Sequence, residues 1–143
     1  MPDLPDATYL TDFHAYRAEH DPDGRCWTYL ERTWTWGEAW DDVRRFAGAL
    51  QAEGIVRGDR VAFLDKNNPA ILDYVINDAG APILCVGHEL APSIDLIRDR
   101  LVGVERIVVV GGDDDELEAW LAAATPVERQ PGVDPDDVCL VMY

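Results

Sequence analysis

Lysine and serine are almost absent from this chain of 143 residues, because Lys66 is the only lysine and Ser93 the only serine. A Walker-type phosphate loop ends in Gly-Lys followed by Ser or Thr. Lys66 is followed by Asn67, so that loop is excluded, and no G-x-G-x-x-G run occurs either. Ser93 follows Pro92 and lacks the flanking glycines of a G-x-S-x-G turn, which excludes the serine nucleophile of the α/β-hydrolase type.

Positive charge is also scarce. The chain has 12 Lys plus Arg against 28 Asp plus Glu, a formal net charge of -16. Because phosphate backbones bind clustered cations, this balance excludes nucleic acid as a natural partner and disfavours an anionic membrane surface. Hydrophobic residues make up 48% of the chain. A chain of this length and composition is expected to fold as a single domain over residues 1–143.

The cysteines are too few and too scattered for a disulfide framework. Cys26, Cys85 and Cys139 are odd in number and lie in apolar, strand-like runs, where they are expected to be buried and inert. This pattern predicts a reducing, cytoplasmic compartment. The acidic, proline-broken N-terminus does not resemble a signal peptide, and no apolar run approaches the ~20 residues of a transmembrane segment.

The histidines, the acidic run and the glycine pair are the residues of this sequence that could form a binding site. His14, His20 and His88 have no metal-ligand spacing, and His88 is expected to be solvated. Gly111-Gly112 follows an apolar run and could form an anion-binding nest, but the carboxylates of residues 113–116 would repel a phosphate. The same run lacks the spacing of a calcium loop. The sequence therefore predicts no catalytic, cofactor-binding or metal-binding residue in this chain.

The positions of turn-forming residues and the spacing of hydrophobic residues predict alternating helices and strands. Helices are expected over 11–20, from Trp36 to a stop at Gly54, over 71–79, from Pro92 to Leu101, and around 117–124. Strands are expected over 26–30, 60–64, 83–86, 106–110 and 138–143, and the run 106–110 is typical of a strand buried on both faces. This order predicts an α/β fold, with a parallel or mostly parallel sheet and helices on both faces.

The clearest local signal is Thr35-Trp36-Gly37-Glu38, a capping box at the start of a helix. An apolar stripe follows at helical spacing: Trp36, Ala39, Trp40, Val43, Phe46, Ala47 and Leu50. We interpret this stripe as core, and a cofactor site at its two tryptophans is the less favoured alternative. The opposite, polar face is expected to face solvent: Glu38, Asp41, Arg44, Arg45 and Gln51.

Taken in order, these landmarks resemble the start of AMP-forming acyl-CoA synthetases, the adenylate-forming superfamily, nearest to fatty-acyl-CoA ligases. The matching stretches are Thr28-Tyr29, the T-[YW]-x-E box at 35–38, Phe46-Ala47-Gly48-Ala49-Leu50, the run G-[VI]-x-x-G-D-R-V-A at 54–62, the x-N-x-P turn at 66–69, Y-x-[IL]-x-D-[SA]-[GQ]-A at 74–81, and the strand approach at 136–143. The resemblance covers nearly the whole chain, and the order of its motifs is more specific than any one of them.

The resemblance implies a parent enzyme that uses ATP, magnesium and CoA to convert a carboxylic acid into its CoA thioester. Because the resemblance is nearest to fatty-acyl-CoA ligases, it implies a fatty acid as the substrate. It also implies that the family's nucleotide loop, T-S-G-T-T-G-x-P-K-G, lies beyond Tyr143. The family's helix and strand after the x-N-x-P turn are missing between Ala70 and Ile71, on the order of 25 residues. The chain is therefore expected to be a partial N-terminal domain with an internal deletion, inactive alone and carrying none of the family's site residues.

Such a deletion predicts exposed apolar area, with Trp40, Trp120 and the edge at 138–143 as candidates. It also predicts that Leu64, Val86, Val108 and Leu140 still share one parallel sheet. A complete flavodoxin-like binding or interaction domain without catalysis is the alternative, and a redox or flavin protein is a weaker one.

Overall fold

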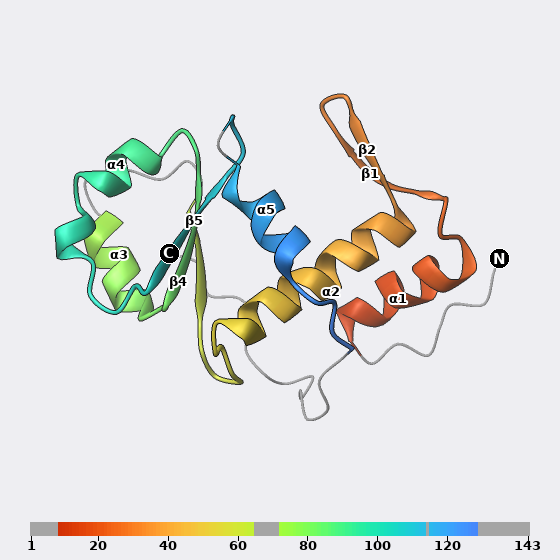
Figure 1. Ribbon diagram of the computed structural model, residues 1–143, viewed down its shortest axis with the longest axis horizontal. Helices are drawn as coiled ribbons and strands as arrows, with labels where there is room; N and C mark the ends of the chain where they lie inside the picture. Colours follow the sequence, from red (N-terminus) through yellow and green to blue (C-terminus); the bar gives the residue numbers. More distant parts are fainter. Residues whose placement is uncertain (1–8, 65–71, 114, 129–143) are drawn as a thin grey trace. The chain divides into compact units, whose positions relative to one another are not determined.

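The computed structural model of the chain describes residues 9–64, 72–113 and 115–128. These residues form two compact units (Figure 1). The first contains residues 9–53 and 124–128, and the second contains residues 54–64, 72–113 and 115–123. The chain thus leaves the first unit after residue 53 and returns to it at residue 124. The single domain expected over residues 1–143 remains a prediction.

The first unit is built from two helices and a hairpin: α1 (Leu10–His20), β1 (Arg25–Tyr29), β2 (Arg32–Thr35) and α2 (Trp36–Ala52). The predicted capping box is confirmed, because Thr35 N–H donates to Glu38 Oε2 at 2.9 Å and Glu38 N–H donates to Thr35 Oγ1 at 3.2 Å. The predicted stop is confirmed as well. Gly54 has a φ of +83°, a left-handed conformation that glycine adopts without strain.

The strand β2 was not predicted. It pairs antiparallel with β1, placing Trp27 opposite Trp34 and Tyr29 opposite Arg32. The signal for it is a mirror-like pattern around Leu30-Glu31, in which an aromatic residue and a threonine alternate on both sides. The strong helix start at Thr35 obscured this pattern, since β2 runs directly into the helix cap.

The second unit contains a parallel sheet in the order β3-β4-β5, formed by β3 (Val61–Leu64), β4 (Ile83–Gly87) and β5 (Arg106–Val110). Between the strands lie α3 (Leu72–Ala79), α4 (Ala91–Asp95) and a short 3-10 helix, η2 (Arg98–Arg100), and α5 (Glu116–Ala123) follows. Leu64 pairs with Val86, and Cys85 with Val108, as expected for one parallel sheet. Leu140 lies outside the described residues.

Helices cover both faces of this sheet. On one face, α3 and α4 contribute Leu72, Ile76 and Ile94 to a core shared with alternate sheet residues such as Leu84 and Val86. On the other face, α5 packs against β5. Figure 1 shows α3 and α4 on one side of the strands and α5 on the other. The predicted α/β class with a parallel sheet and helices on both faces is confirmed.

Two predictions about this unit were wrong in detail. The strand buried on both faces is β4, whose residues 83–86 are all buried, and not β5, where only Val108 is fully buried. The reason is position, because β4 lies between β3 and β5.

The helix predicted from Pro92 to Leu101 also ends early, at Asp95. After Asp95 the chain continues with i→i+3 hydrogen bonds, in which Ile97 N–H and Leu101 N–H each donate to the carbonyl three residues earlier. The three-residue turn places Ile94 and Ile97 on one side.

The prediction that Trp120 is uncovered was also wrong. Its side chain is only 8% exposed, and the guanidinium carbon of Arg106 lies 5.0 Å from its ring centroid. Trp40 is half-buried. The edge at 138–143 and the position of the expected deletion, between Ala70 and Ile71, lie outside the described residues.

Candidate functional site

The glycine pair after β5 was the one loop that could have held a phosphate. Gly111 N–H donates to Asp115 Oδ2 at 3.0 Å, so this donor already has an acceptor within the chain. A side chain on Gly112 would meet the ring of His88 within 2.9 Å, so the imidazole occupies the space beside the loop. His88 is nevertheless exposed, as predicted. This geometry is that of a closed turn.

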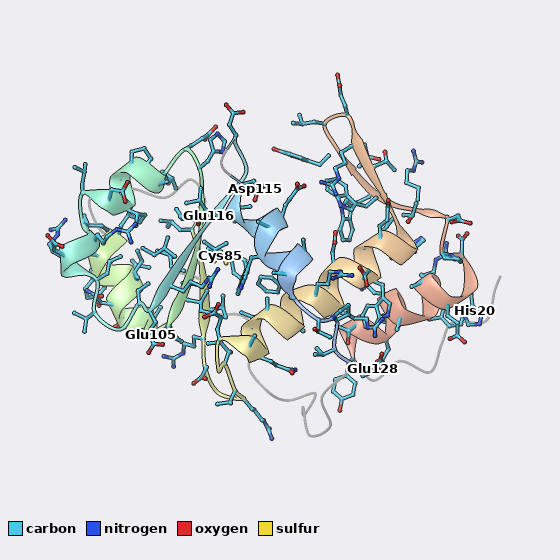
Figure 2. The ribbon with its side chains drawn as sticks, in the orientation of Figure 1. His20, Cys85, Glu105, Asp115, Glu116 and Glu128 are labelled. Atoms are coloured by element: carbon cyan, nitrogen blue, oxygen red, sulfur yellow. The ribbon has the colours of Figure 1, made fainter. Side chains whose placement is uncertain are left out.

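The acidic residues after the glycine pair accept hydrogen bonds from the main chain. Asp115 Oδ1 accepts from Leu117 N–H at 2.9 Å, and Glu116 Oε2 accepts from Val109 N–H at 2.9 Å. Both side chains lie at the start of α5, where carboxylates are favoured by the helix dipole (Figure 2). Among the residues that the structure describes, no three His, Cys, Asp or Glu side chains are grouped so that they could hold a metal ion.

The two described cysteines are free thiols. Cys85 is buried in β4, as predicted, and burial raises the pKa of its thiol from 9.0 to about 11. Cys26 is only half-buried, contrary to prediction, because β1 belongs to a two-stranded hairpin whose other β1 residues are exposed. Burial still raises the pKa of the Cys26 thiol. Since the thiolate is the nucleophile, neither environment favours a reactive cysteine. Cys139 lies outside the described residues.

The residues of the G-[VI]-x-x-G-D-R-V-A run form a turn and a hydrogen bond that joins the start of β3 to the end of α3. Asp59 closes the turn, because its Oδ2 accepts from Val56 N–H at 2.9 Å while its own N–H donates to the Val56 carbonyl at 3.0 Å. The next residue, Arg60, donates through Nη1 to the carbonyl of Ala79 at 2.9 Å, at the end of α3. This run therefore positions β3 and α3, and its Asp59 and Arg60 side chains serve the fold.

Asn77, in the Y-x-[IL]-x-D stretch, has a similar role. Its Nδ2 donates to the Arg100 carbonyl at 2.9 Å, and its Oδ1 accepts from Val102 N–H at 2.7 Å. One amide side chain thus joins α3 to the chain that leads into β5. The local sequence around Asn77 does not indicate this role, because the partners of the side chain lie 23 and 25 residues away.

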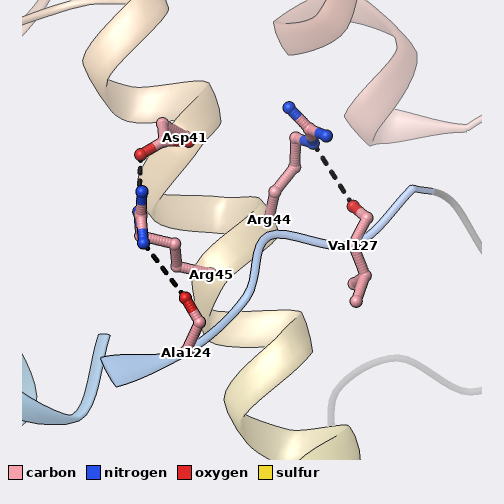
Figure 3. Close-up of polar contacts among 5 residues, drawn as sticks. All are labelled: Asp41, Arg44, Arg45, Ala124 and Val127. Atoms are coloured by element: carbon pink, nitrogen blue, oxygen red, sulfur yellow. Dashed lines mark hydrogen bonds and ion pairs between the residues drawn. The ribbon is translucent and has the colours of Figure 1, made fainter. Parts of the chain in front are cut away.

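The Phe46–Leu50 motif marks a point where distant chain crosses α2. A side chain on the buried Gly48 would place its Cβ 2.0 Å from the carbonyl oxygen of Thr125. Beside this crossing, Arg45 donates to Asp41 Oδ2 at 2.6 Å and to the Ala124 carbonyl at 3.0 Å, and Arg44 donates to the Val127 carbonyl at 3.3 Å (Figure 3). We name residues 124–128 the crossing segment.

Two residues assigned to a solvent-facing surface therefore have a different role. Arg44 and Arg45 are only 28% and 32% exposed and bind main-chain carbonyls of the crossing segment. Nothing in the local sequence of α2 signals these partners, because they lie 79 or more residues away. The feature that could have found them is Gly48, since a glycine inside a long helix indicates close approach by another chain segment.

Aromatic side chains gather at the base of the hairpin. The His14 ring lies edge-on to Trp27 and Trp36, at centroid distances of 6.5 and 5.7 Å, and Trp27 lies 6.2 Å from Trp34. Together they join α1 to the hairpin and to the first turn of α2. Such edge-to-face contacts stabilise packing. Trp36, one of the two tryptophans of the apolar stripe, therefore contributes to the packing of α2 against α1.

Comparison with known proteins shows which fold the described residues form. Residues 15–72 match the AMP-binding enzyme family. A benzoate CoA ligase from Burkholderia xenovorans LB400 has the same fold, with a TM-score of 0.76, 16% sequence identity, and coverage of 89% of this chain and 31% of that one. The fold is that of the N-terminal region of adenylate-forming enzymes.

Relatives identified by sequence indicate which family of adenylate-forming enzymes this chain matches. The feruloyl-CoA synthase of Amycolatopsis sp is 30% identical over 135 aligned positions, which include 76% of this chain and 25% of that protein. The fatty acid–[acyl-carrier-protein] ligase ScoC of Streptomyces coeruleorubidus is 24% identical over 168 positions, 99% of this chain and 31% of that protein. The chain belongs to the AMP-forming acyl-CoA synthetase family and spans a quarter to a third of the length of these relatives.

The alignment with ScoC also bears on the missing elements. It extends over 168 positions, although this chain has only 143 residues. The alignment must therefore contain positions at which ScoC has residues and this chain has none. The place of the deletion, between Ala70 and Ile71, stays a prediction.

Proposed function

We propose that the whole protein is an ATP-dependent carboxylate–CoA ligase. In this reaction a carboxylate oxygen attacks the α-phosphorus of ATP, and the bond to pyrophosphate breaks to leave an acyl-adenylate. The CoA thiol then attacks the acyl carbon, AMP leaves, and a thioester forms. Magnesium assists the first step by neutralising phosphate charge. The family membership of this chain is the observation that carries the proposal.

Within that enzyme, we assign the described residues the role of a scaffold. Phosphoryl chemistry requires cations and main-chain donors that are directed at a ligand. Eight of the ten arginines of the described residues are instead directed at carboxylates, carbonyls or rings of the chain itself. Their partners are Asp21 for Arg17, Trp34 for Arg32, Val127 for Arg44, Asp41 for Arg45, Ala79 for Arg60, Asp95 for Arg98, Asp73 for Arg100 and Trp120 for Arg106.

We propose a fatty or aromatic carboxylic acid as the substrate, with fatty acids tested first. The relatives named above support both classes, since one is a feruloyl-CoA synthase and the other a fatty acid ligase. They also differ in the group that accepts the acyl chain, which is CoA in one name and an acyl-carrier protein in the other. Both acceptors therefore belong in the test.

We also propose that a helix and a strand are missing between Ala70 and Ile71. The extra positions in the ScoC alignment support this proposal.

We further propose that the protein is cytoplasmic. The free thiols of Cys26 and Cys85 support this proposal. Among the described residues, none of the helices is long and apolar enough to cross a membrane.

ATP–pyrophosphate exchange tests the proposed reaction. The 143-residue chain is compared with a version that carries the native downstream sequence and a restored helix–strand pair, each with magnesium and a panel of fatty acids, ferulate and benzoate. Exchange by the longer chain alone is expected. Exchange by the short chain would overturn the scaffold assignment. Silence of both chains on every acid would contradict the proposed reaction and favour a complete binding domain.

A further inference from the structure

We draw no further inference here: the strongest candidate, the shallow apolar groove that Trp40, Val43 and Ala47 of α2 line beside the crossing segment, has no occupant that can be named, because nothing in the structure shows what covers it.

Discussion

Gly48 allows the crossing segment to approach α2. A β-carbon at this position would lie 2.0 Å from the Thr125 carbonyl oxygen, so α2 or the segment would have to move. Within a helix, alanine is normally favoured over glycine by about 1 kcal/mol. For Gly48→Ala we expect the opposite sign, a loss of about 2–4 kcal/mol in the free energy of unfolding. Urea denaturation followed by tryptophan fluorescence measures the change.

Gly37 is the matched control, because it lies in the same helix and would meet its neighbour less closely. Its added Cβ would lie 3.2 Å from the Pro22 carbonyl oxygen, which a shift of a few tenths of an ångström relieves. Gly37→Ala is expected to change the free energy of unfolding by less than about 1 kcal/mol. Equal effects of the two substitutions would show that contact at Gly48 is not what limits the helix.

Cys85 makes the stability of the chain depend on alkaline pH. Its thiol ionises at about 11 in the folded chain and near 9.0 when unfolded. Between these values the unfolded state loses its proton first, so the free energy of unfolding falls as pH rises. The contribution is fully present below pH 9 and decreases by roughly 2–3 kcal/mol by pH 11, at about 1.4 kcal/mol per pKa unit. Denaturation curves at pH 8, 9, 10 and 11 measure it.

Other groups also titrate in this range, so the comparison is with Cys85→Ala. That variant should be less stable than wild type at pH 8 and should lose less stability between pH 9 and 11. Parallel pH profiles for the two proteins would contradict a buried, neutral thiol in β4.

At the scale of elements, Arg45 connects α2 to the crossing segment. Its guanidinium binds Asp41 and the Ala124 carbonyl, and it is only 32% exposed. Arg45→Met keeps the apolar stem and leaves the carbonyl without its donor. We expect a loss of about 1–2 kcal/mol in the free energy of unfolding. Amide hydrogen exchange should also become faster in residues 124–128 than in α1.

Arg98→Met provides the control for this substitution. Arg98 pairs with Asp95 at 3.0 Å, but both side chains are more than half exposed. Exposed ion pairs contribute about 0–1 kcal/mol, so this variant should be close to wild type. If Arg98→Met costs as much as Arg45→Met, the link to the crossing segment has no special role.

Elements whose signals are local could be predicted from the sequence. The α2 helix has a capping box, an apolar stripe and a terminal glycine within twenty residues, and its limits were predicted closely. The alternation of short apolar runs and helical stripes likewise gave the parallel sheet. The hairpin strand β2 was missed because a strand that ends in a helix cap has no turn signal of its own.

Features that depend on distant partners could not be predicted. The contacts of Arg45 and Asn77 join residues 79 and 23 positions apart, and no local pattern records them. The central position of β4 is a property of strand order, which apolar content alone does not reveal. The closed turn at Gly111 has a local cause, because Asp115, whose carboxylate accepts from Gly111 N–H, lies only four residues away.

At the scale of the whole molecule, the family motifs serve the fold. Their residues cap α2, close the turn before β3, and join α3 to the chain leading into β5. Under the proposed function, these motifs build the scaffold on which the nucleotide-binding segments of the whole enzyme would be placed. Membership of the family and possession of its site are then separate properties.

Isothermal titration calorimetry of the folded 143-residue chain with ATP and magnesium tests that separation most directly. A scaffold in which Asp115 accepts from Gly111 N–H, and in which eight of the ten described arginines bind the chain itself, should give no saturable heat up to millimolar ATP. The longer chain with its native downstream sequence should bind ATP under the same conditions. Saturable binding by the short chain, with a Kd below about 1 mM, would contradict the account.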